Sequence, residues 1–559
     1  MRSDLSHLKK IKKRLFHIKM RLAEDNPSKK WTLEDLELAL RNLKNNKSRD
    51  PDGFLNEIFK KDVIGNDLKN SMLIMFNKIK EAQIIPKFMK RANITTVPKK
   101  GSRLNLENER GIFRVSVLRN ILMRLIYNQS YSEIDKNMSD CQMGGRKSKG
   151  CRNNIFIING IIHDVISSKK KHPVSLQIYD YRQMFDTIFL EEAISDLFDA
   201  GCKNDNLALI YQANKEISMA VNTPHGQTDV QTLEDVVLQG DTWSSLLAAV
   251  QVDNICQEVD RSGLGYKYKD ILSVSMLGLI DDLIGITNAG YQTKLMNTII
   301  NTKTAEKRLQ FGVSKCKSMI IEKQTDTHLS RTLSIDSWNA EHVKNMNTGE
   351  TELIEKYEGK IQLEKTEKQK YLGFILSSKG DNMINITNLK NKSIGITRKI
   401  FTKLESLKLR KYYFECALIF LNVILRSSIL YASETYYGLT ETQIRQIERI
   451  EENFLRKLFK TSRGCPISQL YLESGHIPAR FQIYKNRLLF LKYILQQDSK
   501  SLINQFLKLQ IKYPTRGDWA SSCQQNMKYL EIEMKMDEIR DMKRNDFIKL
   551  INEAIKRRG

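Results

Sequence analysis

The chain has 559 residues, of which 41% are hydrophobic and 28% charged, and this composition excludes an intrinsically disordered protein. A chain of this length exceeds one compact core, so we expect several subdomains. The 90 Lys and Arg outnumber the 65 Asp and Glu, and the net charge of +25 favours a polyanionic partner such as nucleic acid. The alternative is a basic protein that has no such partner.

The N-terminal sequence, the apolar runs and the cysteine spacing together indicate the cellular compartment. No apolar run is predicted to reach the length of a membrane span, and the N-terminal segment lacks the apolar stretch of a signal peptide. The eight cysteines form no CxxC pair, so most are expected to be buried thiols in a reducing compartment. We therefore expect an intracellular protein with no membrane partner.

The N-terminal segment combines basic and amphipathic sequence. Residues 1–30 are basic with helical periodicity, and both a nucleic-acid-binding arm and a solvated helix remain open. From Trp31 the pattern predicts an amphipathic helix, with Thr32 as its N-cap and Asp35 completing a near capping box. The turn over Lys47–Gly53 ends this segment.

Two apolar segments in the middle of the chain end at, or are interrupted by, acidic residues. Residues 174–180 predict a buried strand that ends at Asp180. Residues 271–287 predict a β-hairpin with Asp281 and Asp282 at or near its tip. A buried helix is the alternative for the second segment, although two adjacent carboxylates are costly to bury without a partner.

The remaining segments are simpler. Residues 326–362 are polar and irregular, which is typical of a surface hairpin or a linker. After about residue 385 the sequence has nearly continuous 3.6-residue periodicity, which predicts a helical C-terminal part.

The three acids indicate a possible chemistry if their strands are neighbours in one sheet. Clustered carboxylates repel one another unless cations neutralise them. Mg²⁺ prefers oxygen ligands and keeps waters and substrate phosphates in its shell. Two such ions can hold the attacking and leaving oxygens of a phosphoryl displacement. Asp180, Asp281 and Asp282 are therefore candidate ligands of a nucleotide-transferring site.

A series of motifs resembles the reverse transcriptases of non-LTR (LINE-type) retrotransposons. In chain order they are KSRDPDG (Lys47–Gly53), VPKKG (Val97–Gly101), NERGI (Asn108–Ile112), CQMGGRKSKG (Cys141–Gly150), QIYDYRQMFDTI (Gln177–Ile188), VLQGDTWSSLL (Val237–Leu247), LIDD (Leu279–Asp282), FGVSKCKSM (Phe311–Met319) and KYLGFIL (Lys370–Leu376). The chain departs from the family pattern at Asp50, Gly145, Ser245 and Leu279, where glycine, an aromatic residue, proline and tyrosine are usual.

The resemblance implies an α+β fold, the right-hand polymerase, with fingers, an antiparallel-sheet palm, a helical thumb and a helical C-terminal extension. The implied divisions are a basic N-terminal extension (1–35), a fingers-side helical segment (36–90), a reverse transcriptase domain of fingers and palm (91–376), a thumb (377–465) and a helical C-terminal region (466–559). It also implies an RNA template, a DNA primer or target, deoxynucleoside triphosphates, and two Mg²⁺ ions, with Mn²⁺ as an alternative.

Site residues follow from the same resemblance, position by position. The implied metal ligands and catalytic acids are Asp180, Asp281 and Asp282, with Lys315 as the proton donor to pyrophosphate. The implied nucleotide-binding residues are Lys99, Arg110, Phe185 as a sugar gate, Gln239 and Gly240, and the implied primer grip is Tyr371, Leu372 and Gly373.

Other interpretations remain open. A catalytically inactive polymerase fold that only binds RNA, or a fragment of a longer polyprotein, is the main alternative, and a maturase-like splicing cofactor is another. The sequence shows no clear nuclease motif, so we expect a separate or missing endonuclease domain. Synthesis in the cytoplasm with action in the nucleus is the expected localisation.

Overall fold

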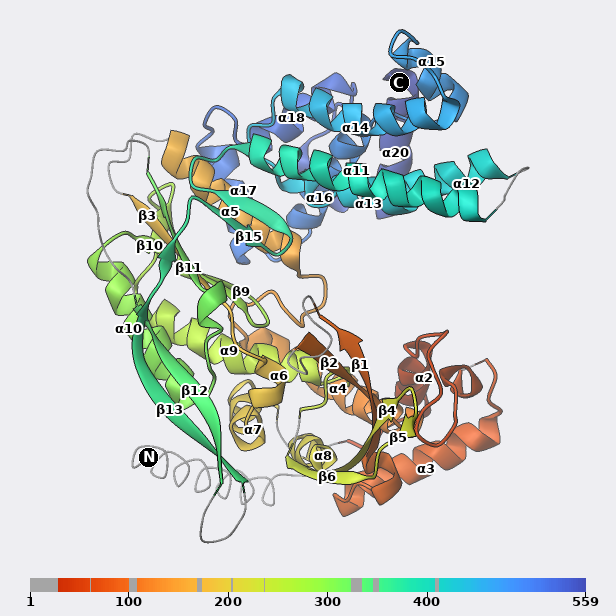
Figure 1. Ribbon diagram of the computed structural model, residues 1–559, viewed down its shortest axis with the longest axis vertical. Helices are drawn as coiled ribbons and strands as arrows, with labels where there is room; N and C mark the ends of the chain where they lie inside the picture. Colours follow the sequence, from red (N-terminus) through yellow and green to blue (C-terminus); the bar gives the residue numbers. More distant parts are fainter. Residues whose placement is uncertain are drawn as a thin grey trace.

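The computed structural model describes residues 29–60, 62–99, 108–167, 173–202, 205–235, 237–322, 334–344, 351–407 and 412–558. An α/β half and a helical half lie at opposite ends of the molecule, and a central sheet lies between them (Figure 1). Residues 1–28, which include most of the predicted basic arm, lie outside the described residues.

The first helices pack at the N-terminal end of the described chain. Helix α2 (Leu33–Arg41) begins after Thr32, whose side chain and that of Asp35 form a reciprocal capping box, so the predicted helix is confirmed. Helix α2 contacts both α3 (Asn66–Ala82) and α4 (Val117–Asn137). Short 3₁₀ turns, η1 (Asn56–Phe59) and η2 (Lys87–Lys90), complete this part.

A five-stranded N-terminal sheet follows these helices, and the sequence analysis did not predict it. Its order is β2-β1-β4-β5, with β6 also paired to β4, and β1 pairs with β4 in parallel. The strands are β1 (Arg91–Pro98), β2 (Glu109–Val115), β4 (Lys215–Thr223), β5 (Gly226–Gln227) and β6 (Gln231–Asp235). Helices α6 (Met184–Thr187), α7 (Leu190–Asp199) and α8 (Asp205–Ala213) lie between the strands in the sequence.

The central sheet has the order β14-β11-β3-β10-β9 and is antiparallel except at its β11–β14 edge. Strand β3 (Val174–Tyr179) is buried along its whole length, as an apolar run with no alternation predicts. The hairpin prediction is also confirmed, because β9 (Met276–Leu279) pairs antiparallel with β10 (Asp282–Asn288). The strands β11 (Lys317–Ile321) and β14 (Glu364–Lys365) complete the sheet.

Helices cover both faces of the central sheet. Helix α5 (Cys151–Ser167) packs on one face, where its isoleucines join Val174, Leu176 and Ile178 of β3 in one core. Helices α9 (Ser244–Arg261) and α10 (Tyr291–Glu306) contact β9 and β10 on the other face. The sheet is therefore a buried layer, and only the ends of its strands can present side chains to a ligand.

Three separate hairpins complete the described strands. They are β7 (Tyr266–Tyr268) with β8 (Leu272–Val274), β12 (Ser334–Lys344) with β13 (Thr351–Gln362), and β15 (Lys368–Tyr371) with β16 (Phe374–Ser377). The long β12–β13 pair shows that the described part of residues 326–362 is a hairpin and not a linker.

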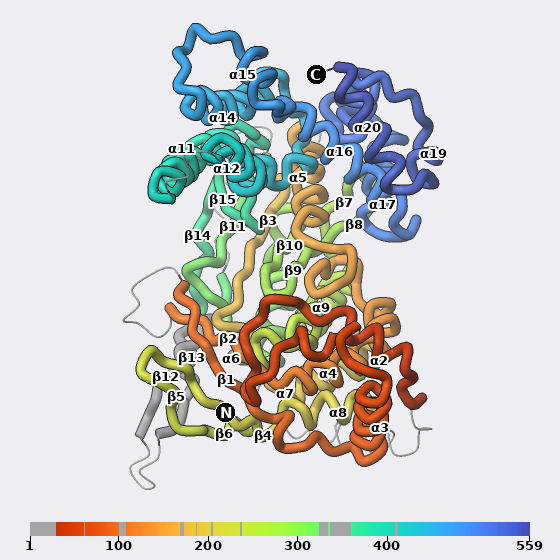
Figure 2. Tube along the Cα trace, turned by 90° about the vertical axis from the view of Figure 1, so that its right-hand side faces the viewer, coloured from red at the N-terminus to blue at the C-terminus, as the bar shows by residue number. Residues whose placement is uncertain are grey.

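The C-terminal part is helical, as its periodicity predicts. The α-helices are α11 (Asn382–Ser406), α12 (Tyr413–Phe420), α13 (Ser427–Ile429), α14 (Glu441–Phe459), α15 (Ile467–Ser474), α16 (Ala479–Leu495), α17 (Leu502–Lys512), α18 (Trp519–Tyr529), α19 (Met536–Asp541) and α20 (Arg544–Arg558). A π-helical turn (Leu421–Arg426) and a 3₁₀ turn, η6 (Ser433–Thr435), interrupt the series. These helices share one hydrophobic core with α5 and the central sheet. Figure 2 shows α11, α12, α14 and α15 to one side of α5, and α16, α17, α19 and α20 to the other.

One helical stretch corrects the prediction about apolar runs. Residues Tyr413–Thr435 are long and apolar enough to cross a membrane by length and composition, and 39% of their most apolar window is buried. A core helix of a soluble protein meets the same criterion, so this stretch is weak evidence for a membrane.

The cysteines behave as their spacing predicts. All eight are free thiols, and Cys141, Cys202, Cys256, Cys316 and Cys523 are buried.

Candidate active site

The ends of adjacent central strands bring the three acidic residues together. Asp180 directly follows β3, and Asp282 is the first residue of β10. The β3–β10 register pairs Leu283 with Tyr179, so Asp282 and Asp180 extend from neighbouring strands at the same edge. Asp281 lies in the tight turn between β9 and β10.

All three acids line one cavity of about 1330 Å³. The same cavity is lined by every nucleotide-binding candidate from the sequence and by Lys315, namely Lys99, Arg110, Phe185, Gln239, Gly240 and Lys315. The structure thus brings together nine predicted residues from separate parts of the fold: the N-terminal sheet, the strand ends of the central sheet, helix α6, the loop before α9 and the turn Val313–Lys315. The volume exceeds what one nucleotide needs and leaves room for a template base and a primer end.

Burial and mutual repulsion raise the pKa values of two carboxylates in this cavity. Burial, together with the nearby charges of Asp281 and Asp180, raises the pKa of Asp282 to about 6. Burial also raises the pKa of Asp281, and repulsion from Asp180 adds to the effect, whereas Lys315 and Arg110 oppose it. Cations placed here would relieve this repulsion.

Lys315 supplies one positive charge to this cluster. Its Nζ lies 2.8 Å from Oδ1 of Asp180 and forms an ion pair at the cavity wall. A 3₁₀ turn over Val313–Lys315 carries the lysine, and the amide of Gly312 donates to the carbonyl of Asp180. The lysine is therefore fixed next to the acid, although about two thirds of its side chain is exposed.

Phe185 lies in the one-turn helix α6, which starts after Gln183 in a left-handed conformation. Its ring lines the cavity and also packs against the core that α9 shares with α10. This position is compatible with a sugar gate, as the resemblance implies, and equally with a core residue.

A buried ion pair holds the loop of Gln239 and Gly240. Gly240 has a φ of +108°, a conformation that favours glycine, and the amide of Phe113 in β2 donates to the carbonyl of Gln239. The adjacent Asp241 accepts from Nη2 of Arg119 in α4 at 2.8 Å, and both side chains are almost fully buried. Sequence reasoning assigned no role to Arg119 or Asp241.

Gln142 is a third residue to which the sequence analysis assigned no individual role. Its Oε1 accepts from the amides of Gly144 and Ile280, and its Nε2 donates to the carbonyl of Ile280. Ile280 has a φ of +59°, which is unfavourable for a β-branched residue, and it directly precedes Asp281. Gln142 thus holds the turn that presents the acid.

A sequence signal for this arrangement was present. Gln142 lies inside the motif Cys141–Gly150, and Gly144 of that motif is also necessary, because a Cβ there would lie 2.2 Å from the amide nitrogen of Ile280. The sequence shows the motif, but it does not show that the motif contacts the β9–β10 turn.

The predicted primer-grip residues do not line the cavity. They form the β15–β16 turn, in which Leu372 and Gly373 both have positive φ. The hydroxyl of Tyr371 hydrogen-bonds with Asn154 of α5, and the hydroxyl of Tyr431 donates to the carbonyl of Leu372 at 2.5 Å. The turn is therefore fixed against α5 and the helical region.

The donor chemistry of the cavity fits Mg²⁺, since three carboxylates from adjacent strand ends carry the oxygen ligands that this ion prefers. Within the described residues, however, no three His, Cys, Asp or Glu side chains are gathered closely enough to hold a metal ion. Instead, the ammonium of Lys315 donates a hydrogen bond to Oδ1 of Asp180. Asp180, Asp281 and Asp282 are the side chains that would hold the ion.

One comparison with known proteins bears on this site. A family model described as reverse transcriptase (RNA-dependent DNA polymerase) matches residues 97–376. The matched span starts in β1, ends in β16 and contains every residue that lines the cavity.

Proposed function

The chain belongs to the reverse transcriptase family, whose model matches half of its length, and from this premise we propose that it copies RNA into DNA from a primer 3′-OH. The observation that carries the proposal is the set of acids Asp180, Asp281 and Asp282 at adjacent strand ends, in one cavity with candidate triphosphate ligands. A reverse transcriptase of this family has a palm and uses an RNA template, a DNA primer, deoxynucleotides and divalent metal ions.

Each cavity residue has a proposed role. Asp180, Asp281 and Asp282 would hold two Mg²⁺ ions, which when bound stabilise the charge that builds up during phosphoryl transfer. Lys99 and Arg110 would contact the triphosphate, since a guanidinium can bind phosphate oxygens with two hydrogen bonds. We propose that Gln239 and Gly240 contact the nucleotide and that Phe185 lies beneath its sugar.

Lys315 has two successive roles in this proposal. Its ion pair with Asp180 neutralises part of the acidic cluster before metal binds. During turnover, the ammonium of Lys315 would donate a proton to the leaving pyrophosphate.

The subdomains, the primer contacts and the origin of the chain are proposed beyond the family match. We propose that the N-terminal sheet with its helices forms the fingers, that α11–α14 form the thumb, and that Tyr371, Leu372 and Gly373 contact the primer. The motif order supports an origin in a non-LTR retrotransposon, and such an element acts in the nucleus after synthesis in the cytoplasm. Target cutting would then depend on an endonuclease encoded separately or elsewhere in the element.

Primer extension tests the proposal directly. The purified chain is given an RNA template, an annealed DNA primer, deoxynucleotides and Mg²⁺, and the products are separated by length. We expect template-dependent extension that a chelator abolishes and that added Mg²⁺ or Mn²⁺ restores. Binding of the annealed template and primer without any extension would instead favour the inactive RNA-binding alternative.

A further inference from the structure

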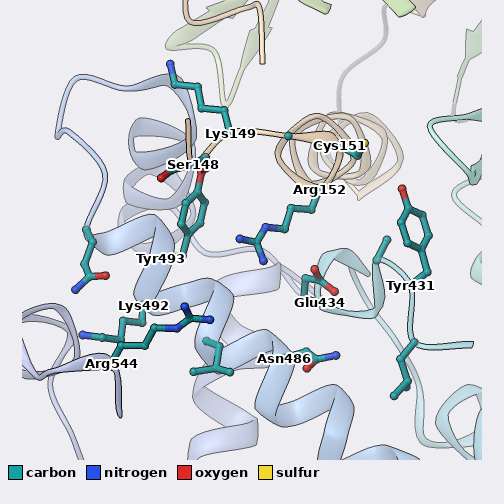
Figure 3. A pocket seen from close by; sticks show the side chains of 15 residues that line it. Ser148, Lys149, Cys151, Arg152, Tyr431, Glu434, Asn486, Lys492, Tyr493 and Arg544 are labelled. Atoms are coloured by element: carbon teal, nitrogen blue, oxygen red, sulfur yellow. The ribbon is translucent and has the colours of Figure 1, made fainter. Parts of the chain in front are cut away.

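A second pocket, of about 800 Å³, lies outside the proposed catalytic cavity. Its walls are the first turn of α5, the segment around Tyr431 and Glu434, helix α16 and the start of α20 (Figure 3). The pocket thus joins the central sheet's covering helix to residues 466–559, a region to which the sequence assigned no function.

The pocket contains four cationic side chains, and two of them are already engaged. Lys149 pairs with Asp140 at 2.9 Å, and Lys492 donates to backbone carbonyls at the end of α19. Arg152 and Arg544 are exposed, and neither forms an ion pair with any other described residue. Two guanidiniums therefore remain available for an anionic ligand.

Two aromatic rings hold Arg152 in place, and it interacts electrostatically with Glu434 without forming an ion pair in the described structure. Its guanidinium lies 4.9 Å from the ring centroid of Tyr493 and 5.3 Å from that of Phe490. Tyr493 is itself fixed, because its hydroxyl donates to the carbonyl of Ser148 and accepts from Asn153. Figure 3 shows the guanidinium directed into the pocket, between Tyr493 and Glu434.

Two structural links connect this pocket to the polymerase site. The segment before α5 contacts the β9–β10 turn through Gln142 and then continues to Lys149 in the pocket wall. Tyr431, which lines the pocket, donates to the carbonyl of Leu372 in the proposed primer grip. The pocket is therefore linked by direct contacts to the β9–β10 turn and to the proposed primer grip.

We propose that this pocket binds a single-stranded nucleic-acid segment, with Arg152 and Arg544 contacting phosphates and the ring of Tyr431 stacking on a base. This inference rests on the proposed function, because it takes the nucleic acid to be the polymerase's own template or product. An aromatic ring beside a positively charged pocket is the pattern by which proteins bind single strands without reading sequence.

The size and charge of the pocket support a single strand over a duplex. About 800 Å³ falls within the range of pockets that enclose one small ligand, so one or two nucleotides can enter. The first turn of α5 adds the positive end of a helix dipole. The opposing charge is Glu434, a single carboxyl whose pKa is raised by burial.

The test measures binding of labelled single-stranded RNA and DNA oligonucleotides to the full chain over a range of salt concentrations. The matched variants are Arg152→Ala with Arg544→Ala, and Lys549→Ala, which removes an exposed charge from another face of α20. Each lost phosphate contact should reduce the slope of log affinity against log salt by about 0.7 for a single strand. The double variant should therefore lose about 1.4 from the slope, and Lys549→Ala should lose much less.

Tyr431 gives an independent measurement. Tyr431→Ala should weaken binding roughly 5- to 150-fold, whereas Tyr431→Phe keeps the ring and should retain most of the affinity. A loss with RNA alone identifies the template as the occupant, and a loss with DNA alone identifies the primer or product strand.

Several results would overturn the inference. These are a wild-type chain that binds neither oligonucleotide, a double variant with the wild-type slope for both, and an equal loss in Lys549→Ala. Because binding is measured without Mg²⁺ or deoxynucleotides, it does not depend on catalysis. A wild-type chain that fails to extend primers would overturn the proposed function while leaving the slope measurement intact.

Discussion

At the scale of single residues, the turn before Asp281 depends on the amide of Gln142. Gln142→Ala would leave the amides of Gly144 and Ile280 without their acceptor and release an isoleucine from a left-handed conformation. Displacing a reacting group by about 1 Å can cost on the order of 100-fold in rate. We therefore expect kcat to fall about 10- to 100-fold, with the KM for deoxynucleotides changing little.

Steady-state primer extension checks this prediction, and Gln257→Ala is the control. The Gln257 amide bonds to Asn137 and Asp253, outside the catalytic cavity, so its loss should leave kcat near the wild-type value. A Gln142→Ala enzyme with normal kcat would show that the turn keeps its shape without the glutamine.

Phe185 is the second prediction at this scale. If its ring lies beneath the sugar, Phe185→Ala should admit ribonucleotides, because a side chain can exclude the 2′-hydroxyl by its bulk. One steric contact of this kind is worth roughly 10- to 200-fold in discrimination. The measurement is the ratio of kcat/KM for a deoxynucleotide and its ribonucleotide, in the wild type and the variant. An unchanged ratio in a folded, active variant would assign Phe185 to the core alone.

The residues differ in how far the sequence could predict them. Asp180, Asp281 and Asp282 end or interrupt apolar strands, and that local pattern is readable without a structure. The contacts of Gln142 with Ile280 and of Arg119 with Asp241 join positions more than 100 residues apart. No local pattern encodes such pairs, so only the fold reveals them.

At the scale of elements, the Arg119–Asp241 pair fixes helix α4 to the loop that lines the nucleotide side of the cavity. Arg119→Met would leave Asp241 buried without its partner, which typically costs about 3–5 kcal/mol. We expect a lower midpoint of denaturant unfolding and a higher KM for deoxynucleotides, since Gln239 and Gly240 lose their support.

Arg124→Met provides the comparison on the same helix. Arg124 lies over the ring of Tyr127 but pairs with no carboxylate in the described structure, so its loss should change the midpoint much less. Equal effects of the two substitutions would mean that the buried pair adds nothing beyond the general packing of α4.

Local sequence patterns predict some of the helices and strands but not others. The capping box at Thr32, the apolar run of β3 and the periodicity of the C-terminal helices are local signals, and the structure confirms those elements. The sequence analysis did not predict the N-terminal sheet, because its parallel β1–β4 pairing joins strands more than 100 residues apart. Such a pairing depends on tertiary context.

At the scale of the whole molecule, the net charge of +25 should make template binding steeply dependent on salt. With roughly six phosphate contacts, affinity for an RNA–DNA duplex should fall about a thousandfold between 50 and 200 mM salt. Fluorescence anisotropy with a labelled duplex measures this directly. A flat salt response would contradict the interpretation that the basic excess serves nucleic-acid binding.

The central claim is that the acids of the large cavity perform catalysis, and Asp281→Asn tests it most directly. The amide keeps the size of the side chain but weakens a metal ligand, and losing one electrostatic stabiliser already costs on the order of 10²–10³ in rate. The measurement pairs primer extension with template–primer binding in the same preparation. The account predicts that extension is abolished while binding is largely retained, and extension near the wild-type rate would contradict it.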